Sequence, residues 1–128
     1  MKSRNALELA YQIAKDRFKE LSGIVVDIIK LREINIKEGW EKGDEILKKV
    51  VDEIQKRTSD VTMVRYSGDN FLLFTPREKA KETARVIEEI EEETSINLRV
   101  VEIPKIDNIE KLQRELTELE FEGRFSSM

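Results

Sequence analysis

Cysteine and histidine are both absent from this sequence of 128 residues. Without cysteine there is no disulfide and no thiolate nucleophile, and without histidine the chain lacks the most frequent general base and zinc ligand. Any catalysis would therefore depend on carboxylates, a bound metal or backbone groups. No apolar run approaches the ~20 residues that a membrane-spanning helix needs, and the N-terminal segment does not have the pattern of a signal peptide. We therefore expect no membrane association and a cytoplasmic location.

A strong excess of positive charge is missing as well. The chain has 23 basic and 27 acidic residues, interspersed along the sequence, and a net charge of −4. Because nucleic-acid binding through phosphates needs a basic stripe or patch, this composition disfavours a nucleic-acid partner. The frequent Lys, Glu and Ile are typical of proteins from thermophiles, which bears on habitat and not on activity.

What the sequence does contain is a regular succession of apolar patterns. Apolar residues at helical spacing predict helices, and short apolar or β-branched runs predict strands. In chain order the expected elements are a helix at 5–20, a buried strand within 23–31, a short helical turn and loop at 32–43, a helix at 44–56, strands at 61–67 and 70–76, a helix at 77–93, a strand at 96–103 and a helix from 107. We expect Pro76 and Pro104 to end their strands and Asp107 to cap the last helix.

The order of these elements predicts an α+β fold. A helix is followed by β-α-β-β-α-β and a further helix, and the central six elements match the ferredoxin-like split βαβ unit. Gly68 and Asp69 predict a tight hairpin between the second and third strands, which argues against a doubly wound parallel sheet because parallel neighbours need a crossover. We expect one domain, because no linker or repeat interrupts the chain. That single domain, at 1–128, would comprise an N-terminal helix at 1–21, the βαββαβ core at 22–103, and a C-terminal helix and tail at 104–128.

Two aspartates are expected at the same end of this sheet. In the ferredoxin-like topology the first strand lies antiparallel to the third, so the end of the first strand meets the tip of the hairpin. Asp27 lies late in the first strand and Asp69 lies in the hairpin. An acid inside a buried strand is costly unless it is compensated, and carboxylates on neighbouring strands suit Mg²⁺. The alternative is that Gly-Asp and Asp-Asn are ordinary turn residues, and both interpretations stay open.

Three segments of the sequence resemble one known family. They read DIIKLREINIKEGWEKGDEIL from Asp27, RYSGDNF from Arg65 and EFEGRF from Glu120. Their residues and spacing are similar to those of the GGDEF domain of diguanylate cyclases, whose sheet is palm-like and nucleotide-cyclase-like, in agreement with the fold expected above. The matching positions are Asp27, Ile34, Asn35, Gly39, Gly43, Asp44, Leu47, Arg65, Tyr66, Gly68, Asp69, Phe71, Gly123 and Arg124.

The resemblance implies a guanine-nucleotide site with a metal ion. By this likeness Asp27 and Asp69 would supply carboxylates and Ile28 a carbonyl oxygen to Mg²⁺. Asn35 and Asp44 would hydrogen-bond the guanine base, and a site that pairs the base donors rejects analogues that lack them.

The phosphates of GTP would meet three further residues. Arg124 matches an arginine of the family's closing motif, and guanidinium geometry suits a triphosphate. Arg32 stands where the family has a lysine near the phosphates. Gly68 retains a glycine of the signature, at which substrate approaches the backbone.

Several departures from the family pattern indicate a degenerate member. Asn70 replaces the second acid of the signature, and an amide neither accepts a proton at neutral pH nor brings negative charge to a second metal. No residue is therefore assigned as catalytic. Ser67 replaces a glycine and Glu120 a phosphate-binding lysine, while Ile29 and Ile36 replace acids.

The family also has an inhibitory product site, an Arg-x-x-Asp that precedes the signature. Arg57 to Asp60, RTSD, has this form but lies one residue further from the signature than in the family. Because a slip of one residue reverses the face of a strand, we favour a helix end followed by a turn.

Four functions are compatible with these residues. The first, favoured by the retained Asn35 and Asp44, is a GGDEF-like domain without cyclase activity that binds a guanine nucleotide or a protein partner in signalling. The second is an active diguanylate cyclase that makes cyclic di-GMP from two GTP, which requires two domains to bring the two GTP molecules together. A homodimer or fusion to a sensor domain is compatible with each of these signalling roles. The third is a GTP hydrolase, because SGDNF also resembles the Gly-Gly-Asp-Asn motif of archaeal GTP cyclohydrolase III. The fourth is a structural domain without a ligand.

Overall fold

The computed structural model describes residues 3–67 and 70–121 of the chain. The helices are α1 Ser3–Arg17, α2 Leu31–Glu38, α3 Trp40–Arg57, α4 Ala80–Thr94 and α5 Ile109–Phe121, with a 3₁₀ turn, η1 Arg77–Lys79, before α4. The strands are β1 Leu21–Ile28, β2 Thr62–Ser67, β3 Asn70–Pro76 and β4 Leu98–Ile106.

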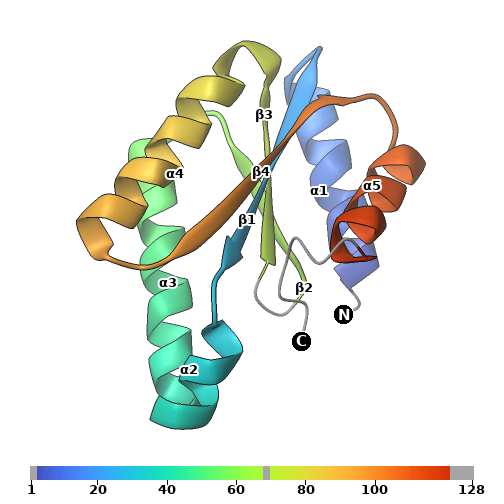
Figure 1. Cartoon of the computed structure of the whole chain (residues 1–128). Helices are drawn as coiled ribbons and strands as arrows, with labels where there is room; N and C mark the ends of the chain where they lie inside the picture. The colour runs from blue at the N-terminus through green and yellow to red at the C-terminus, as the bar shows by residue number, and fades with distance from the viewer. Residues whose placement is uncertain (1–2, 68–69, 122–128) are drawn as a thin grey trace.

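The four strands form one antiparallel sheet in the order β2-β3-β1-β4. Helices α3 and α4 cover one face of the sheet, α1 and α5 cover the other, and α2 lies beyond the end of β1 (Figure 1). This strand order is that of the ferredoxin-like unit, so the predicted α+β fold is confirmed.

The centre of the hydrophobic core is β1, because both of its faces are covered. All its residues are buried. Ile24, Val26 and Ile28 pack with the apolar residues of α3 and α4, whereas Leu21 and Val25 pack with those of α1 and α5. The continuous apolar run thus forms a central strand buried on both faces, as predicted.

The segment at 32–43 differs from the turn and loop expected there. It holds most of helix α2 and the first turn of α3, and Gly39 separates the two helices. Lys30, before α2, has a left-handed backbone conformation (φ 63°), and Gly39 has φ 93°, which glycine adopts without a steric penalty. The backbone N–H of Gly39 donates to the carbonyl of Asn35 at 3.1 Å. A helical hairpin therefore extends from the end of β1.

The last strand does not end at Pro104, contrary to the prediction. It continues to Ile106, because β4 lies at the edge of the sheet, where a residue without an N–H is tolerated. The register of β4 against β1 shifts between Leu21 and Gly23, and the Ser22 hydroxyl donates to the Pro104 carbonyl at 2.6 Å. Such a bulge allows the strand to pass the proline.

The cap of α5 is Asn108 and not Asp107, so this prediction was wrong. The Asn108 Oδ1 accepts a hydrogen bond from the backbone N–H of Lys111 at 2.8 Å. The carbonyl of Asp107 instead accepts from the hydroxyl of Tyr11 at 3.0 Å, which ties α1 to the start of α5.

Some apolar side chains stay at the surface. Leu9 and Ile13 of α1 are 59% and 46% exposed, and Trp40 at the start of α3 is 71% exposed. Over the residues that the structure describes, no helix has the length and apolar character needed to cross a bilayer.

Candidate nucleotide site

A row of polar residues crosses the sheet near the end of β1. In the strand register Asp27 lies opposite Asn70 of β3 and opposite Arg99 of β4. Directly opposite residues of antiparallel strands share a face and have Cβ atoms about 4.5–5.5 Å apart. Since strand residues alternate, this is the face of Val25, which α1 and α5 cover. Asp27 and Asn70 are both 0% exposed, and Arg99 is half-buried.

Arg99 gives this row a positive charge that the sequence did not reveal as part of a site. A carboxylate without access to water is costly unless a positive charge or hydrogen-bond donors compensate it. The register offers Asp27 a guanidinium on one side and an amide on the other. The acid within an apolar run was the signal in the sequence, but only strand register identifies its neighbours.

The Mg²⁺ site expected from Asp27, Ile28 and Asp69 is described only in part. Asp27 and the Ile28 carbonyl lie together at the end of β1, whereas Asp69 lies outside the described residues. Within the described part of the chain, no group of three or more acidic side chains could hold a metal. Mg²⁺ is usually held by one or two carboxylates together with substrate phosphates. Of the expected ligands, the described residues thus supply one carboxylate, from Asp27, and the Ile28 carbonyl.

The two residues expected to read the guanine base lie in the α2–α3 hairpin. Asn35 is on the last turn of α2 and Asp44 on the first turns of α3, so the hairpin brings the two helices that carry them side by side. The Oδ1 atom of Asn35 is covered, and it lies against Gly43, where helix α3 has no side chain. Asp44, the next residue, is exposed. The hairpin thus offers one partly covered amide and one solvent-facing carboxylate.

The residues expected near the phosphates are only partly described. Arg32 is exposed on α2, near the end of β1. Gly68 and Arg124 lie outside the described residues. Their predicted roles therefore stay predictions.

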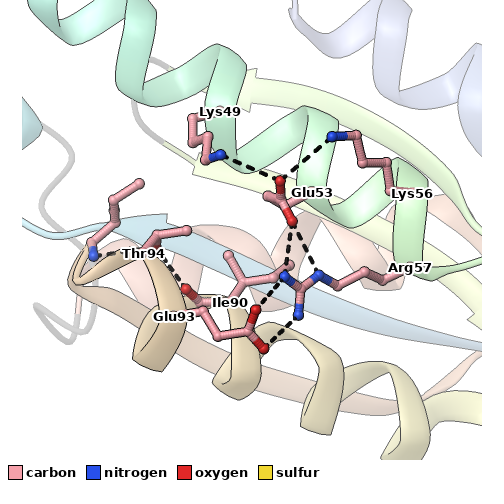
Figure 2. A network of polar contacts seen from close by, with 8 residues as sticks. Lys49, Glu53, Lys56, Arg57, Ile90, Glu93 and Thr94 are labelled. Carbon is pink, nitrogen blue, oxygen red and sulfur yellow. Dashed lines mark hydrogen bonds and ion pairs between the residues drawn. The ribbon is translucent and has the colours of Figure 1, made fainter.

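Arg57 and Asp60, the two ends of the RTSD segment, form ion pairs with other residues of the protein. Figure 2 shows the guanidinium of Arg57, at the end of α3, between Glu53 of the same helix and Glu93 of α4. Arg57 donates to Glu53 at 2.9 and 3.1 Å and to Glu93 at 2.7 and 3.0 Å. These hydrogen bonds raise the pKa of Arg57, with Glu93 the larger cause, and lower the pKa of both carboxylates below the ordinary 4.5.

Asp60, at the other end of the segment, is held by two cations. Its carboxylate accepts from Lys79 at 2.7 Å and lies 3.8 Å from Arg17. The hydrogen bond to Lys79 lowers the pKa of Asp60 and raises that of Lys79. With Arg57 and Asp60 occupied in this way, the geometry agrees with a helix end followed by a turn.

Comparison with known proteins identifies the family to which the sequence is similar. The model of the family described as "Diguanylate cyclase, GGDEF domain" matches residues 2–112. Diguanylate cyclase DosC of Escherichia coli K12 is 39% identical over 72 residues, and its relative in Shigella sonnei is 37% identical over 71. These matches cover 55% of this chain but only 15% of the length of those proteins.

Solved structures share the fold at low sequence identity. The GGDEF domain of DgcB from Caulobacter crescentus, in complex with c-di-GMP, superposes with a TM-score of 0.66 at 22% identity, over 94% of this chain and 81% of that one. The active GGEEF domain of a diguanylate cyclase from Vibrio cholerae gives 0.64 at 23% identity, over 96% and 92%. The fold is therefore that of the cyclase-like α+β domains. Within that class, the chain belongs to the GGDEF domain family of the diguanylate cyclases.

Proposed function

We propose that this GGDEF domain binds a guanine nucleotide and does not form cyclic di-GMP. The observation that carries the proposal is the contrast between two parts of the molecule. The α2–α3 hairpin keeps Asn35 and Asp44 on adjacent helices, one partly covered and one exposed. The row at the end of β1 instead places the amide of Asn70 opposite Asp27.

The chemistry of the row argues against turnover. Formation of a phosphodiester from GTP requires that a hydroxyl loses its proton and that negative charge is stabilised on the phosphates. Asn70 cannot accept that proton, and it adds no negative charge that would hold a second metal. Arg99, opposite Asp27 on the other side, adds a positive charge to the row, which disfavours a further cation beside Asp27.

Nucleotide binding itself needs less than catalysis does. Arg32, Arg124 and Gly68 would contact the triphosphate, and a Mg²⁺ ion that arrives with it would meet Asp27, the Ile28 carbonyl and Asp69. We expect Asp69→Asn to abolish the Mg²⁺-dependent part of this binding, because it removes one of the two carboxylates. A signalling role, with a second copy, a sensor domain or a protein partner, belongs to the same proposal.

A second candidate function depends on the same asparagine. If the SGDNF segment acts as its counterpart does in archaeal GTP cyclohydrolase III, Asn70 is compatible with hydrolysis of GTP. The SGDNF motif alone supports this alternative, since the spacing of Asn35 and Asp44 is that of the cyclases. It predicts hydrolysed GTP and no cyclic di-GMP.

One experiment separates these functions. The purified chain is incubated with GTP and Mg²⁺ at high protein concentration, the products are separated by anion-exchange chromatography, and binding of GTP is measured by calorimetry with and without Mg²⁺. We expect unchanged GTP and measurable binding, which Asp44→Asn weakens because the amide lacks the negative charge and keeps only one acceptor oxygen for the base donors. Cyclic di-GMP that is absent from an Asp69→Asn control would contradict the proposal, and hydrolysed GTP would favour the second candidate.

A further inference from the structure

Helix α3 carries a glycine that its backbone conformation does not require. Gly43 lies within the helix and is buried, and it does not have the positive φ that Gly39 has. Glycine is unfavourable inside helices relative to alanine, because it loses more conformational freedom on folding. The reason for a glycine at this position must therefore be space.

The space at Gly43 is filled by the side chain of Asn35 from α2. A Cβ atom at residue 43 would overlap Oδ1 of Asn35 and lie 2.7 Å from its Cγ and 3.3 Å from its Nδ2. Glycine instead directs a hydrogen toward Oδ1, and Cα–H···O contacts between adjacent helices are weakly favourable. Only a residue without a side chain allows the carboxamide of Asn35 to lie in this seam between the helices.

The seam also sets the direction of the carboxamide. Oδ1 is the atom next to Gly43 and is covered from solvent, whereas Nδ2 lies further from that position. The backbone of Asn35 is held as well, because its carbonyl accepts the N–H of Gly39. The amide N–H₂ is therefore the group that Asn35 offers to a ligand. The exposed carboxylate of Asp44, next to Gly43 in the chain, offers acceptors.

We propose that Gly43 is a positioning residue for Asn35, which fixes the carboxamide with its oxygen inward so that the hairpin presents a donor from Asn35 and an acceptor from Asp44. This inference rests on the proposed function in one respect, namely that the ligand is a guanine nucleotide. Guanine carries an acceptor oxygen beside N–H donors, whereas adenine carries an amino group at the position of that oxygen. Gly43 would thus contribute to the preference for guanine without touching the base.

The test uses Gly43→Ala, Asn35→Ala and the double variant, with Lys48→Ala as a control at an exposed position of α3. Alanine favours the helix, but its methyl group displaces the carboxamide. The affinities for GTP and ATP are measured by calorimetry. The side-chain amide signals of Asn35 are followed by ¹H–¹⁵N NMR without nucleotide, and Tm is measured for all four variants.

We expect Gly43→Ala to lose about tenfold in GTP affinity, as does Asn35→Ala, because one hydrogen bond to the base is lost in each. The double variant should lose no more than either single variant, and Lys48→Ala should bind as the parent does. Discrimination against ATP should fall together with GTP affinity. In the absence of nucleotide the amide signals of Asn35 should shift in Gly43→Ala, and Asn35→Ala should raise the Tm of that variant, because it frees the space that the methyl group needs.

The readouts separate this inference from the proposed function. If the parent chain binds no guanine nucleotide, the proposed function fails, and the amide signals and the coupling in Tm still decide whether Gly43 positions Asn35. If the Asn35 signals do not move in Gly43→Ala and the Tm changes add independently, the inference is overturned. Parent-like GTP affinity in Gly43→Ala, in a chain where Asn35→Ala weakens binding, overturns it too.

Discussion

Asp27, Asn70 and Arg99 stand in one row across three strands, and they are an acid, a neutral amide and a base. Asp27, which lies between the other two, is 0% exposed, so its carboxylate depends on its neighbours for compensation of its charge. With a neutral residue at 70, the cation of the row is Arg99. Asn70, which departs from the family signature, thus lies in the same row as a cation, Arg99 of β4.

Arg99→Met should therefore destabilise the protein. It removes the positive charge opposite a covered carboxylate, and we expect a loss of about 1–3 kcal/mol in the free energy of unfolding. In a chain that carries Asp27→Asn the same substitution should be nearly neutral, because no buried charge then remains to be compensated. Urea unfolding of the two single variants and the double variant measures this coupling. Equal losses in both backgrounds would mean that Arg99 does not serve Asp27.

Among the elements, α5 shows how a few contacts fix the start of a helix. The side chain of Asn108 accepts a hydrogen bond from a backbone N–H in the first turn of the helix. Leu112, Leu116 and Leu119 are the buried residues of its inner face. The side chain of the preceding Asp107 is 3.6 Å from Lys105 at the surface, and its backbone holds the Tyr11 hydroxyl. These two adjacent polar residues therefore have different roles.

Asn108→Ala should cost about 1 kcal/mol in the free energy of unfolding, as is typical for loss of an N-cap. Asp107→Ala is the matched control, since it keeps the backbone carbonyl that Tyr11 uses and removes only an exposed ion pair, which contributes little. Urea unfolding at neutral pH compares the two. A larger loss for Asp107→Ala than for Asn108→Ala would contradict the assignment of Asn108 as the cap.

The elements also show what apolar patterns predict and what they do not. The run around Val25 and the spacing in α3, α4 and α5 predicted these elements correctly, because burial repeats with the period of each structure. Pro104 was misread because a proline is tolerated in an edge strand, and the position of β4 at the edge follows from topology. The length of α2 was underestimated because its sequence is polar and is followed by Gly39, which ends the helix and is not part of a longer loop.

The candidate site was predictable to a different extent. Residues next to each other in a motif, such as Gly43 and Asp44, could be found from the resemblance of the sequence to the family pattern. Arg99 could not, because strand register places it opposite Asp27 and the sequence does not state register. The contact between Asn35 and Gly43 depends likewise on how two helices pack, which no spacing within one helix reveals.

For the molecule as a whole, acid stability should depend on the ion pairs that join its parts. The pKa values of Glu53 and Glu93 lie below their ordinary 4.5, chiefly through hydrogen bonds from Arg57, and that of Asp60 lies below its ordinary 3.8 through Lys79. A group with a lowered pKa stabilises the folded state above its ordinary pKa, and this contribution is lost as the pH falls through the folded value.

We therefore expect stability to be flat near neutral pH and to fall below about pH 4.5, in the range set by these carboxylates. Arg57→Met should flatten this fall, because Glu53 and Glu93 then titrate closer to their ordinary values, and it should lower stability modestly at neutral pH since the groups are near the surface. At alkaline pH the raised pKa of Lys79 should keep its contribution intact up to its ordinary 10.5. Urea unfolding between pH 3 and pH 7 tests the acid limb. An identical pH profile for parent and variant would exclude Arg57 as its cause.

The strand order has a consequence for the chain during its synthesis. Strand β1, all of whose residues are buried, is complete at Ile28, but its two neighbours begin only at Asn70 and Leu98. A nascent chain that has emerged as far as β2 thus carries an apolar strand with both edges open, and pairings so distant in sequence form slowly. Exposed strands of this kind invite association between chains. Before β3 has been synthesised, α1 can cover one face of β1 and α3 can cover the other.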